Sequence, residues 1–325
     1  MEDDSKAVVA QVAQQMLQPT SKCPTLVEAA GPSAKFAWEE FVYGKLRNTS
    51  TRKNYQHAIN RFLAFCEERN RQLTSIMPRD VGEYLDSVPH SDATKKLHLA
   101  ALRHFFDALV SRHAVVLNPA ASVRGPRVHV VEGRTPEIAV RSARRLLNSI
   151  DVSNVVGLRD RAIIGILIYT AVRVSAVAGM LAGDFYDAGD QFYLRFREKR
   201  GKAREIPCRH DLLVYVQQYL QQACINDERS PLFRTTVGRT GRLTDRAMST
   251  GDIARVVKRQ CRRIQIPRHV SPHSFRVTTI TDLLGQGVPL EDVQQLVGHA
   301  DPRTTRLYDR RRRQVTRNIV ERISV

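Results

Sequence analysis

A chain of 325 residues, 42% of them hydrophobic, is long enough for two domains that each bury a core. The formal net charge is +18. Residues 1–33 contain four acidic and only two basic side chains, so the excess lies in the remainder, where a nucleic acid is the first candidate partner and an anionic membrane surface the second. No run reaches the roughly 18–20 apolar residues that span a bilayer, no secretory signal opens the chain, and five scattered cysteines indicate reduced thiols in a cytosolic protein.

The predicted elements begin after a short flexible segment. Residues 1–33 are rich in glutamine, interrupted by prolines and poor in aromatic residues, which is typical of a flexible tail. Residues 34–117 follow as a helical domain, because apolar side chains recur there at helical spacing. Its four expected helices begin near Trp38, at a cap on Ser50, after Pro78 and at Ser91 or Asp92.

An extended basic linker is predicted at residues 118–134, which contain two prolines and several basic side chains. We expect Arg124, Arg127 and Arg134 in this linker to run along the DNA if DNA is the partner. The second domain, residues 135–325, opens with Thr135-Pro136, which predicts the start of a helix.

A small β-hairpin among helices is predicted for the second domain. An apolar block at residues 162–171 indicates a buried helix over about 159–171. Alternation over residues 191–197 indicates a strand with a hairpin partner at residues 203–207. The fold class is therefore mainly α with a small β-hairpin or sheet, in which an N-terminal helical bundle precedes an α+β domain. Further helices are expected near residues 211–223, 250–264, 274–284, 289–297 and 302–308.

Six residues of the second domain could together carry out phosphoryl transfer. That chemistry needs an in-line nucleophile, cations against the non-bridging oxygens and an acid for the leaving oxygen. His273 and Arg276 lie three positions apart, so on a helix they share one face. Tyr308 stands among arginines, whose positive charge favours a nucleophilic phenolate. The candidates are Arg173, Lys199, His273, Arg276, His299 and Tyr308.

These candidates lie in five motifs that follow one another along the chain. The motifs are Ala171-Val-Arg173-Val-Ser175, the Lys199 hairpin that ends at Pro207, Pro272-His-Ser-Phe-Arg276, Leu296-Val-Gly-His299-Ala-Asp301 and Thr304-Thr-Arg-Leu-Tyr308. Together they resemble the tyrosine recombinase, or phage integrase, family. The resemblance covers residues 34–325, because the first domain is similar to the family's core-binding domain. It implies a site-specific recombinase whose two domains, one core-binding and one catalytic, form a C-shaped clamp on double-stranded DNA.

The resemblance also implies the steps of strand cleavage. Tyr308 would attack the scissile phosphate and form a 3′-phosphotyrosyl link. Arg173 and Arg276 would clamp the non-bridging oxygens bidentately, which a lysine could not do. Lys199 would protonate the leaving 5′ oxygen, and Lys202 is its rival for that role.

The two histidines complete the implied site. His273 would act as acid or base, and His299 would hydrogen-bond the phosphate. A zinc site is not favoured, because Cys261, His269 and His273 lack a usual ligand spacing. Since the covalent link conserves the energy of the phosphodiester, neither ATP nor a metal nor another cofactor is expected.

The implied partners are core recombination sites in double-stranded DNA and further copies of the chain. The family joins DNA as a homotetramer on paired sites, with accessory proteins as further candidate partners. A C-terminal segment of each subunit docks on its neighbour. The expected location is the cytoplasm of a prokaryote, at the nucleoid, without membrane association. Residues that could form the docking face are Ile319, Val320, Ile323 and Val325.

Other cations are expected to contact the DNA backbone without reading its sequence. In the first domain they are Lys53, Arg61, Lys95, Lys96 and Arg103. In the hairpin of the second domain they are Arg195, Arg197, Arg200, Lys202 and Arg204.

Two departures from the family pattern affect the expectation. The family commonly has an acidic residue where this chain has Ala176, so either support for Arg173 comes from elsewhere or this arginine is held less firmly. In the second case Ala176→Glu should preserve or raise cleavage. Only about 33 residues precede the first domain, too few for an arm-binding domain, which indicates the simple two-domain type. The alternatives are a type IB topoisomerase, which uses a similar site, and a non-catalytic DNA-binding regulator on the same fold.

Overall fold

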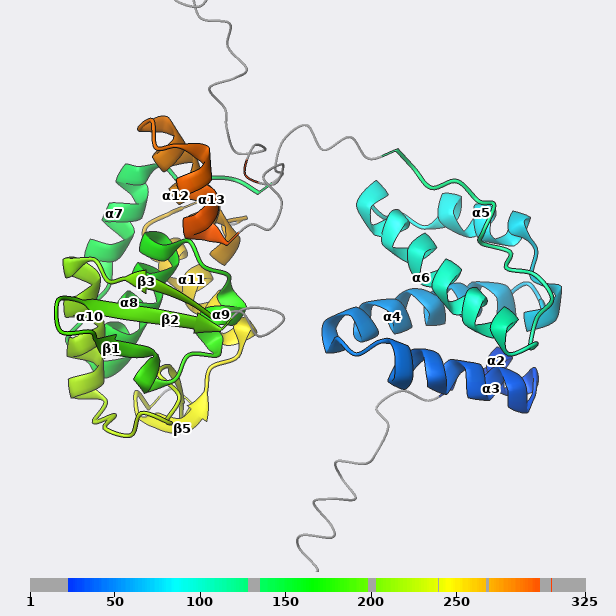
Figure 1. The fold of residues 1–325 in the computed structure, drawn as a ribbon, viewed down its shortest axis with the longest axis horizontal. Helices are drawn as coiled ribbons and strands as arrows, with labels where there is room; N and C mark the ends of the chain where they lie inside the picture. The colour runs from blue at the N-terminus through cyan, green and yellow to red at the C-terminus, as the bar shows by residue number, and fades with distance from the viewer. Residues whose placement is uncertain are drawn as a thin grey trace, which may run out of the picture. The chain divides into compact units, whose positions relative to one another are not determined.

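The computed structural model describes residues 23–127, 135–197, 203–238, 240–266, 269–298 and 305 (Figure 1). The chain divides into two compact units, residues 1–129 and 130–325. Within the described ranges, no helix has the length and apolar character needed to cross a bilayer.

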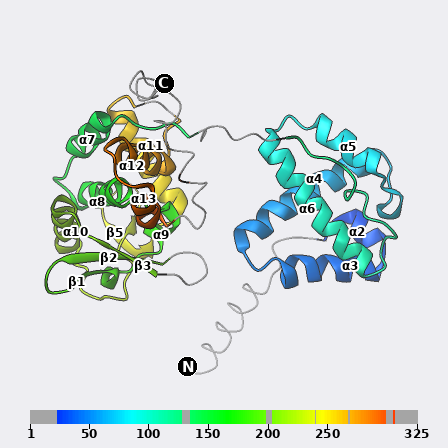
Figure 2. The same ribbon diagram turned by 45° about the horizontal axis from the view of Figure 1, so that its top comes forward.

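The described part of the first unit is built from helices (Figures 1 and 2). Its elements are α2 (Thr25–Ala29), α3 (Pro32–Glu39), the π-helical η1 (Glu40–Lys45), α4 (Thr49–Glu67), the 3-10 turn η2 (Leu73–Ser75), α5 (Pro78–Ser87) and α6 (Asp92–Ser111). Helices α4 and α6 pack against each other, and α3 packs against α6. Trp38 on α3 is buried and meets Phe105 on α6 edge-on, with ring centroids 5.7 Å apart. Aromatic packing of this kind accounts for much of the core.

The folded part of the first unit begins before residue 34. Val27 on α2 is fully buried in the core of the unit, and α3 already begins at Pro32. The expected flexible segment therefore does not extend over residues 23–33. Burial of Val27 on α2 and of Ala34, Ala37 and Trp38 on α3 holds this part of the chain in place.

The helix caps of this unit agree only partly with the prediction. The N-cap of α4 is Asn48, whose side chain accepts a hydrogen bond of 3.0 Å from the backbone N–H of Thr51. The predicted cap, Ser50, lies inside the helix. The predicted start of α6 at Ser91 or Asp92 is confirmed, because α6 begins at Asp92 and the hydroxyl of its N-cap, Ser91, accepts a hydrogen bond from the N–H of Thr94. Asn and Ser are both favoured at N-cap positions, so the residue types alone do not show whether Asn48 or Ser50 caps α4.

The first residues of the expected linker pack on the first unit. Arg103 donates from Nε to the carbonyl of Ala120 at 3.1 Å and from Nη2 to the carbonyl of Val123 at 2.6 Å. Ala120 is fully buried. Arg103 therefore secures the chain as it leaves α6, and the DNA contact expected of it stays a prediction. Residues 128–134 of the linker lie outside the described ranges.

A buried histidine makes the stability of the first unit depend on pH. His98 on α6 is 2% exposed, and its Nδ1 lies 2.8 Å from the hydroxyl of Tyr84. Burial, followed by the nearby His90, His57 and Arg61, lowers the pKa of His98 to about 4. An unfolded histidine titrates near pH 6.5, so the unfolded chain takes up a proton first. The unit should lose up to ~1.4 kcal/mol of unfolding free energy per pH unit as the pH falls from about 6.5 towards 4.

Urea unfolding followed by tryptophan fluorescence measures this loss, because Trp38, the single tryptophan of the chain, lies in the first unit. His98→Gln should flatten the pH dependence. His104→Gln, which removes an exposed histidine from the same helix, should leave it unchanged. An equal slope in wild type and in His98→Gln would show that another group titrates.

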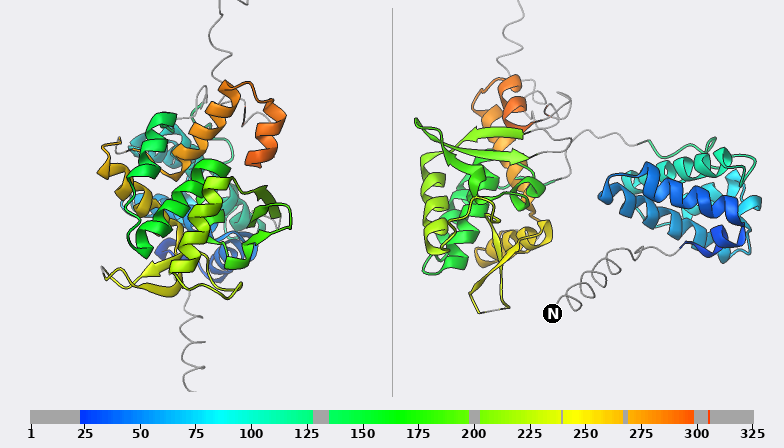
Figure 3. Two further views of the ribbon diagram at one scale, coloured as in Figure 1. Left: turned by 90° about the vertical axis from the view of Figure 1, so that its left-hand side faces the viewer. Right: turned by 60° about the horizontal axis from the view of Figure 1, so that its bottom comes forward.

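The second unit combines helices with a three-stranded sheet (Figures 1 and 3). Its first elements are α7 (Val140–Ser149), α8 (Val155–Thr170), α9 (Val174–Ala178), the 3-10 turn η3 (Ala182–Asp184), β1 (Phe185–Asp187), β2 (Phe192–Arg197) and β3 (Ala203–Pro207). They are followed by α10 (His210–Gln222), β4 (Arg234–Thr236), β5 (Leu243–Ala247), α11 (Thr250–Arg263), α12 (Pro272–Gly285) and α13 (Leu290–Val297). Helix α8 is central, because it packs against α7, α9, α10, α11 and α12.

The predicted hairpin of the second unit is confirmed, and the sheet contains a third strand. Leu194 on β2 lies opposite Ile206 on β3, and both are buried in one core with α8 and Phe196. Strand β1 pairs with the other edge of β2, where Phe185 lies opposite Leu194. Three residues are too few for alternation to reveal such a strand. The antiparallel pair β4–β5 forms a separate hairpin.

The first helix of the second unit begins at Val140 rather than at Pro136. Ile138 is buried, and its backbone N–H donates to the hydroxyl of Thr278 on α12 at 2.8 Å. This contact holds the segment extended against α12, so the chain turns into α7 only afterwards.

Candidate phosphodiester-binding site

Arg173 stands at the turn between α8 and α9. Ala171 ends α8 in the left-handed conformation with a φ of 51°, and Arg173 is the N-cap of α9 with an extended backbone. Val172 is buried, whereas the side chain of Arg173 is exposed. The turn therefore anchors its backbone in the core and presents a guanidinium at the surface.

Arg276 is buried on α12 and joins this turn to the end of α13. Its side chain is 1% exposed. Nη1 donates to the carbonyl of Ala171, and Nη2 donates to the carbonyl of Val297 at 2.7 Å. A buried guanidinium is tolerated only with such partners. Arg276 thus holds the backbone two residues before Arg173 and two residues before His299.

His273 lies one helical turn before Arg276, in the first turn of α12. Its pKa is lowered, first by partial burial of the ring and then by the positive charges of Arg276 and Arg173, although solvent still reaches the side chain. Since both arginines act on this ring, the structure brings the three sequence-predicted side chains together. At neutral pH the imidazole is uncharged and can accept a proton.

The other sequence-predicted candidates fall outside the described residues. Arg197 ends β2 and Ala203 begins β3, so the strands on both sides of the hairpin turn are placed. Val297 ends α13, and Thr305 further along is helical and buried. The candidates outside the described ranges are Lys199, its rival Lys202, His299 and Tyr308.

Three hairpin arginines that were expected to contact DNA have partners inside the protein. Arg195 pairs with Glu205 at 2.9 Å, and Arg197 pairs at 3.1 Å with Asp184, whose carboxylate is buried. The third, Arg204, donates to a carbonyl at the end of α13. Since the side chains of Arg195 and Arg197 also remain partly exposed, their contact with DNA stays a prediction.

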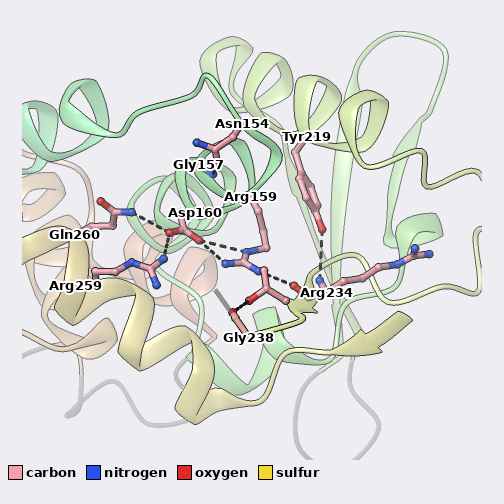
Figure 4. Close-up of polar contacts among 10 residues, drawn as sticks. Asn154, Gly157, Arg159, Asp160, Tyr219, Arg234, Gly238, Arg259 and Gln260 are labelled. Atoms are coloured by element: carbon pink, nitrogen blue, oxygen red, sulfur yellow. Dashed lines mark hydrogen bonds and ion pairs between the residues drawn. The ribbon is translucent and has the colours of Figure 1, made fainter. Parts of the chain in front are cut away.

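A buried ionic network supports α8, the helix that leads into the site (Figure 4). Asp160 is fully buried, and its carboxylate accepts hydrogen bonds from Arg159 and Gln260, each at 2.9 Å, and from Arg259. Arg159 also donates to the carbonyl of Arg234 on β4 at 2.8 Å. The network fixes α8 against α11 and β4. Its one signal in the sequence is a run of three charged residues, Arg159 to Arg161, in an otherwise apolar helix, and that signal does not say which partners they have.

Ala176 on α9 is 5% exposed and belongs to the same core as α8. A glutamate at this position would bury a carboxylate, which is costly without a hydrogen-bonding partner. The structure therefore does not support the expectation that Ala176→Glu preserves or raises cleavage.

A cavity of about 550 Å³ opens elsewhere in the second unit and is lined by parts of α7, α8, α10, α12 and α13. Arg173, His273 and Arg276 do not line it, so the cavity is separate from their cluster. Among the described residues, no three His, Cys, Asp or Glu side chains are grouped as a metal site requires.

Two segments of the chain match known families. Residues 138–314 match the phage integrase family, and residues 43–113 match its N-terminal SAM-like domain. Tyrosine recombinase XerC of Myxococcus xanthus is 30% identical over 227 residues, which are 68% of this chain and 73% of the relative. Tyrosine recombinase XerC of Syntrophus aciditrophicus is 29% identical over 282 residues, which are 80% of this chain and 87% of the relative.

Solved structures share the fold. The XerH site-specific recombinase bound to a palindromic difH substrate, a post-cleavage complex, has a TM-score of 0.68 at 18% identity, over 86% of this chain and 82% of the other. A lambda integrase dimer bound to a COC′ core site has a TM-score of 0.65 at 16% identity, over 96% of this chain and 88% of the other. At these identities the likeness supports the architecture alone.

Proposed function

The chain belongs to the phage integrase family and is a site-specific tyrosine recombinase, and we propose that it cuts and rejoins DNA through Tyr308. The observation that carries the assignment of its site is the grouping of Arg173, His273 and Arg276 at the ends of α8 and α12. Two guanidiniums beside an imidazole suit a phosphodiester and the charge that develops on its oxygens in the transition state.

In the proposed cleavage step, the oxygen of Tyr308 attacks the scissile phosphorus while the bond from phosphorus to the 5′ oxygen breaks. His273 accepts the tyrosine proton, and Lys199 protonates the leaving 5′ oxygen. Arg173 contacts a non-bridging oxygen from the surface, and the buried Arg276 adds positive charge in surroundings of low dielectric. The 3′-phosphotyrosyl link conserves the energy of the phosphodiester, so attack by a 5′ hydroxyl of the partner strand rejoins the DNA.

The proposed partners are core sites in double-stranded DNA and further copies of the chain. A lambda integrase tetramer is known bound to a Holliday junction, and we propose a homotetramer on paired sites here. His299 would hydrogen-bond the same phosphate. The net charge of +18 supports DNA binding that weakens steeply with salt through counterion release. Since the relatives are bacterial, we place the protein in the bacterial cytoplasm, at the nucleoid.

Mapping of a trapped adduct tests the nucleophile. In a nicked duplex that carries the recombination site, recovered from DNA flanking the gene, the short 5′-hydroxyl strand diffuses away after cleavage and the protein–DNA link persists. Wild type is expected to form an SDS-resistant adduct. Trypsin and nuclease digestion should then leave a nucleotide on the peptide of residues 307–310, which contains Tyr308.

A nucleotide on another peptide would reject Tyr308 as the nucleophile. The absence of any adduct would reject the proposed reaction. Relaxation of supercoiled DNA that lacks the site would favour a topoisomerase instead.

A further inference from the structure

Two arginines from different elements hold the C-terminal end of α13. A helix leaves its last four carbonyls without donors of its own. Gly298 ends α13 in the left-handed conformation, and its N–H donates to the carbonyls of Gln294 and Gln295. This N–H therefore does not serve the carbonyls of Leu296 and Val297. Arg204 on β3 donates to the carbonyl of Leu296, and Arg276 on α12 donates to that of Val297. Cations at this end also complement the helix dipole.

The register of the hairpin decides which arginine reaches α13. Arg204 lies opposite Phe196 on β2, and opposed residues of an antiparallel pair share one face of the sheet. Phe196 is fully buried, so Arg204 lies on the face towards the core. Arg195 lies opposite Glu205 on the other face, where the two form a partly exposed ion pair.

We propose that Arg204 is a positioning residue that ties the β2–β3 hairpin to the end of α13 and so sets the hairpin lysine against the phosphate site. The inference rests on the proposed function, in which Lys199 or Lys202 supplies the proton. Both lysines lie among the five residues, 198–202, that join β2 to β3. Because Arg276 holds the same helix end, Arg204 places the hairpin and Arg276 in one framework.

The rate of proton transfer depends on how precisely the Arg204 contact positions the hairpin. The donor and the leaving oxygen must come within about 2.6–3.2 Å of each other, and a displacement of about 1 Å can slow a reaction roughly 100-fold. Without Arg204 the hairpin keeps its pairing with β1 and the contact of Arg197 with Asp184. Removal of the Arg204 contact should therefore shift the hairpin without unfolding it.

Arg204→Met tests this role, because methionine keeps an apolar stem and removes the donors. Single-turnover cleavage is compared on two nicked duplexes, one ordinary and one with sulfur in place of the bridging 5′ oxygen of the scissile phosphate. A thiolate leaves without a proton, so the sulfur duplex does not need the general acid. The variant should be about 100-fold slower than wild type on the ordinary duplex and within about 5-fold on the sulfur duplex.

Glu205→Gln is the matched control. It changes the neighbour of Arg204 on β3 but breaks only the partly exposed pair with Arg195, so both rates should stay within about 2-fold of wild type. Arg204→Lys keeps one donor for the carbonyl of Leu296 and should recover part of the rate. If Arg204→Met does not fold, Arg204→Lys carries the test and should show the same pattern at smaller amplitude.

Equal slowing on both duplexes, or a wild-type rate on the ordinary duplex, would overturn the role of Arg204. If Arg204→Lys is the test variant, the role is overturned when its cleavage rate relative to wild type is the same on both duplexes. If wild type and Glu205→Gln cleave neither duplex, the proposed function itself fails, and that result is distinct from a defect confined to the Arg204 variants.

Discussion

Arg276→Ala is expected to slow cleavage strongly and to destabilise the second unit at the same time. The side chain is 1% exposed and donates to the carbonyls of Ala171 and Val297, which belong to buried residues. Loss of a donor to a buried carbonyl costs about 1–3 kcal/mol each. Loss of the positive charge beside the proposed phosphate position should slow cleavage by about 10³-fold. Single-turnover cleavage and urea unfolding followed by circular dichroism measure the two effects.

Arg173→Ala is the matched comparison, because Arg173 serves the same phosphate in the proposal but is exposed. It should slow cleavage by a similar factor and keep the unfolding free energy within about 0.5 kcal/mol of wild type. Arg276→Lys should not restore cleavage, since one ammonium cannot reproduce the planar fork of a guanidinium. Wild-type stability of Arg276→Ala would contradict the buried contacts. Wild-type cleavage by Arg173→Ala would remove Arg173 from the site.

Asp160→Ala is expected to cost about 3–5 kcal/mol of unfolding free energy in the second unit, because it leaves a buried cation without its partner. Arg159 is 3% exposed and donates to the Asp160 carboxylate at 2.9 Å. The substitution also removes the hydrogen-bond acceptor of Gln260 and Arg259 on α11. Helix α8 should then lose its register against α11, and DNA cleavage should fall with the folded fraction.

Two probes separate the units in this experiment. Circular dichroism follows the helices of both units, whereas fluorescence follows Trp38 in the first unit alone. Asp160→Ala should therefore shift a dichroism transition and leave the fluorescence transition in place. Asp245→Ala is the control, because its carboxylate is 97% exposed in a pair with Arg234 and should contribute no more than about 1 kcal/mol. Equal shifts in the two variants would show that the buried network contributes little.

Periodicity in the sequence was sufficient to locate most helices and the main hairpin. Helix α8 follows from an apolar run, and β2 follows from the alternation of Phe192, Leu194 and Phe196, because burial of a helix or of one strand face imposes its own period. Boundaries were less predictable. Asn48 and Ser50 are both suitable caps, and a segment such as the one around Ile138 stays extended only because α12 lies beside it.

By itself, the sequence determined the two-unit organisation, the order of the elements and the motifs that carry Arg173, His273 and Arg276. Only the tertiary structure decided what each cation contacts. Arg173 is exposed, Arg276 is buried against two carbonyls, and Arg204 donates to a carbonyl at the end of α13. The reason is that periodicity and spacing are local properties of a chain. The partner of a charged side chain can lie far along the sequence, as Ala171 and Arg276 do at a separation of 105 residues.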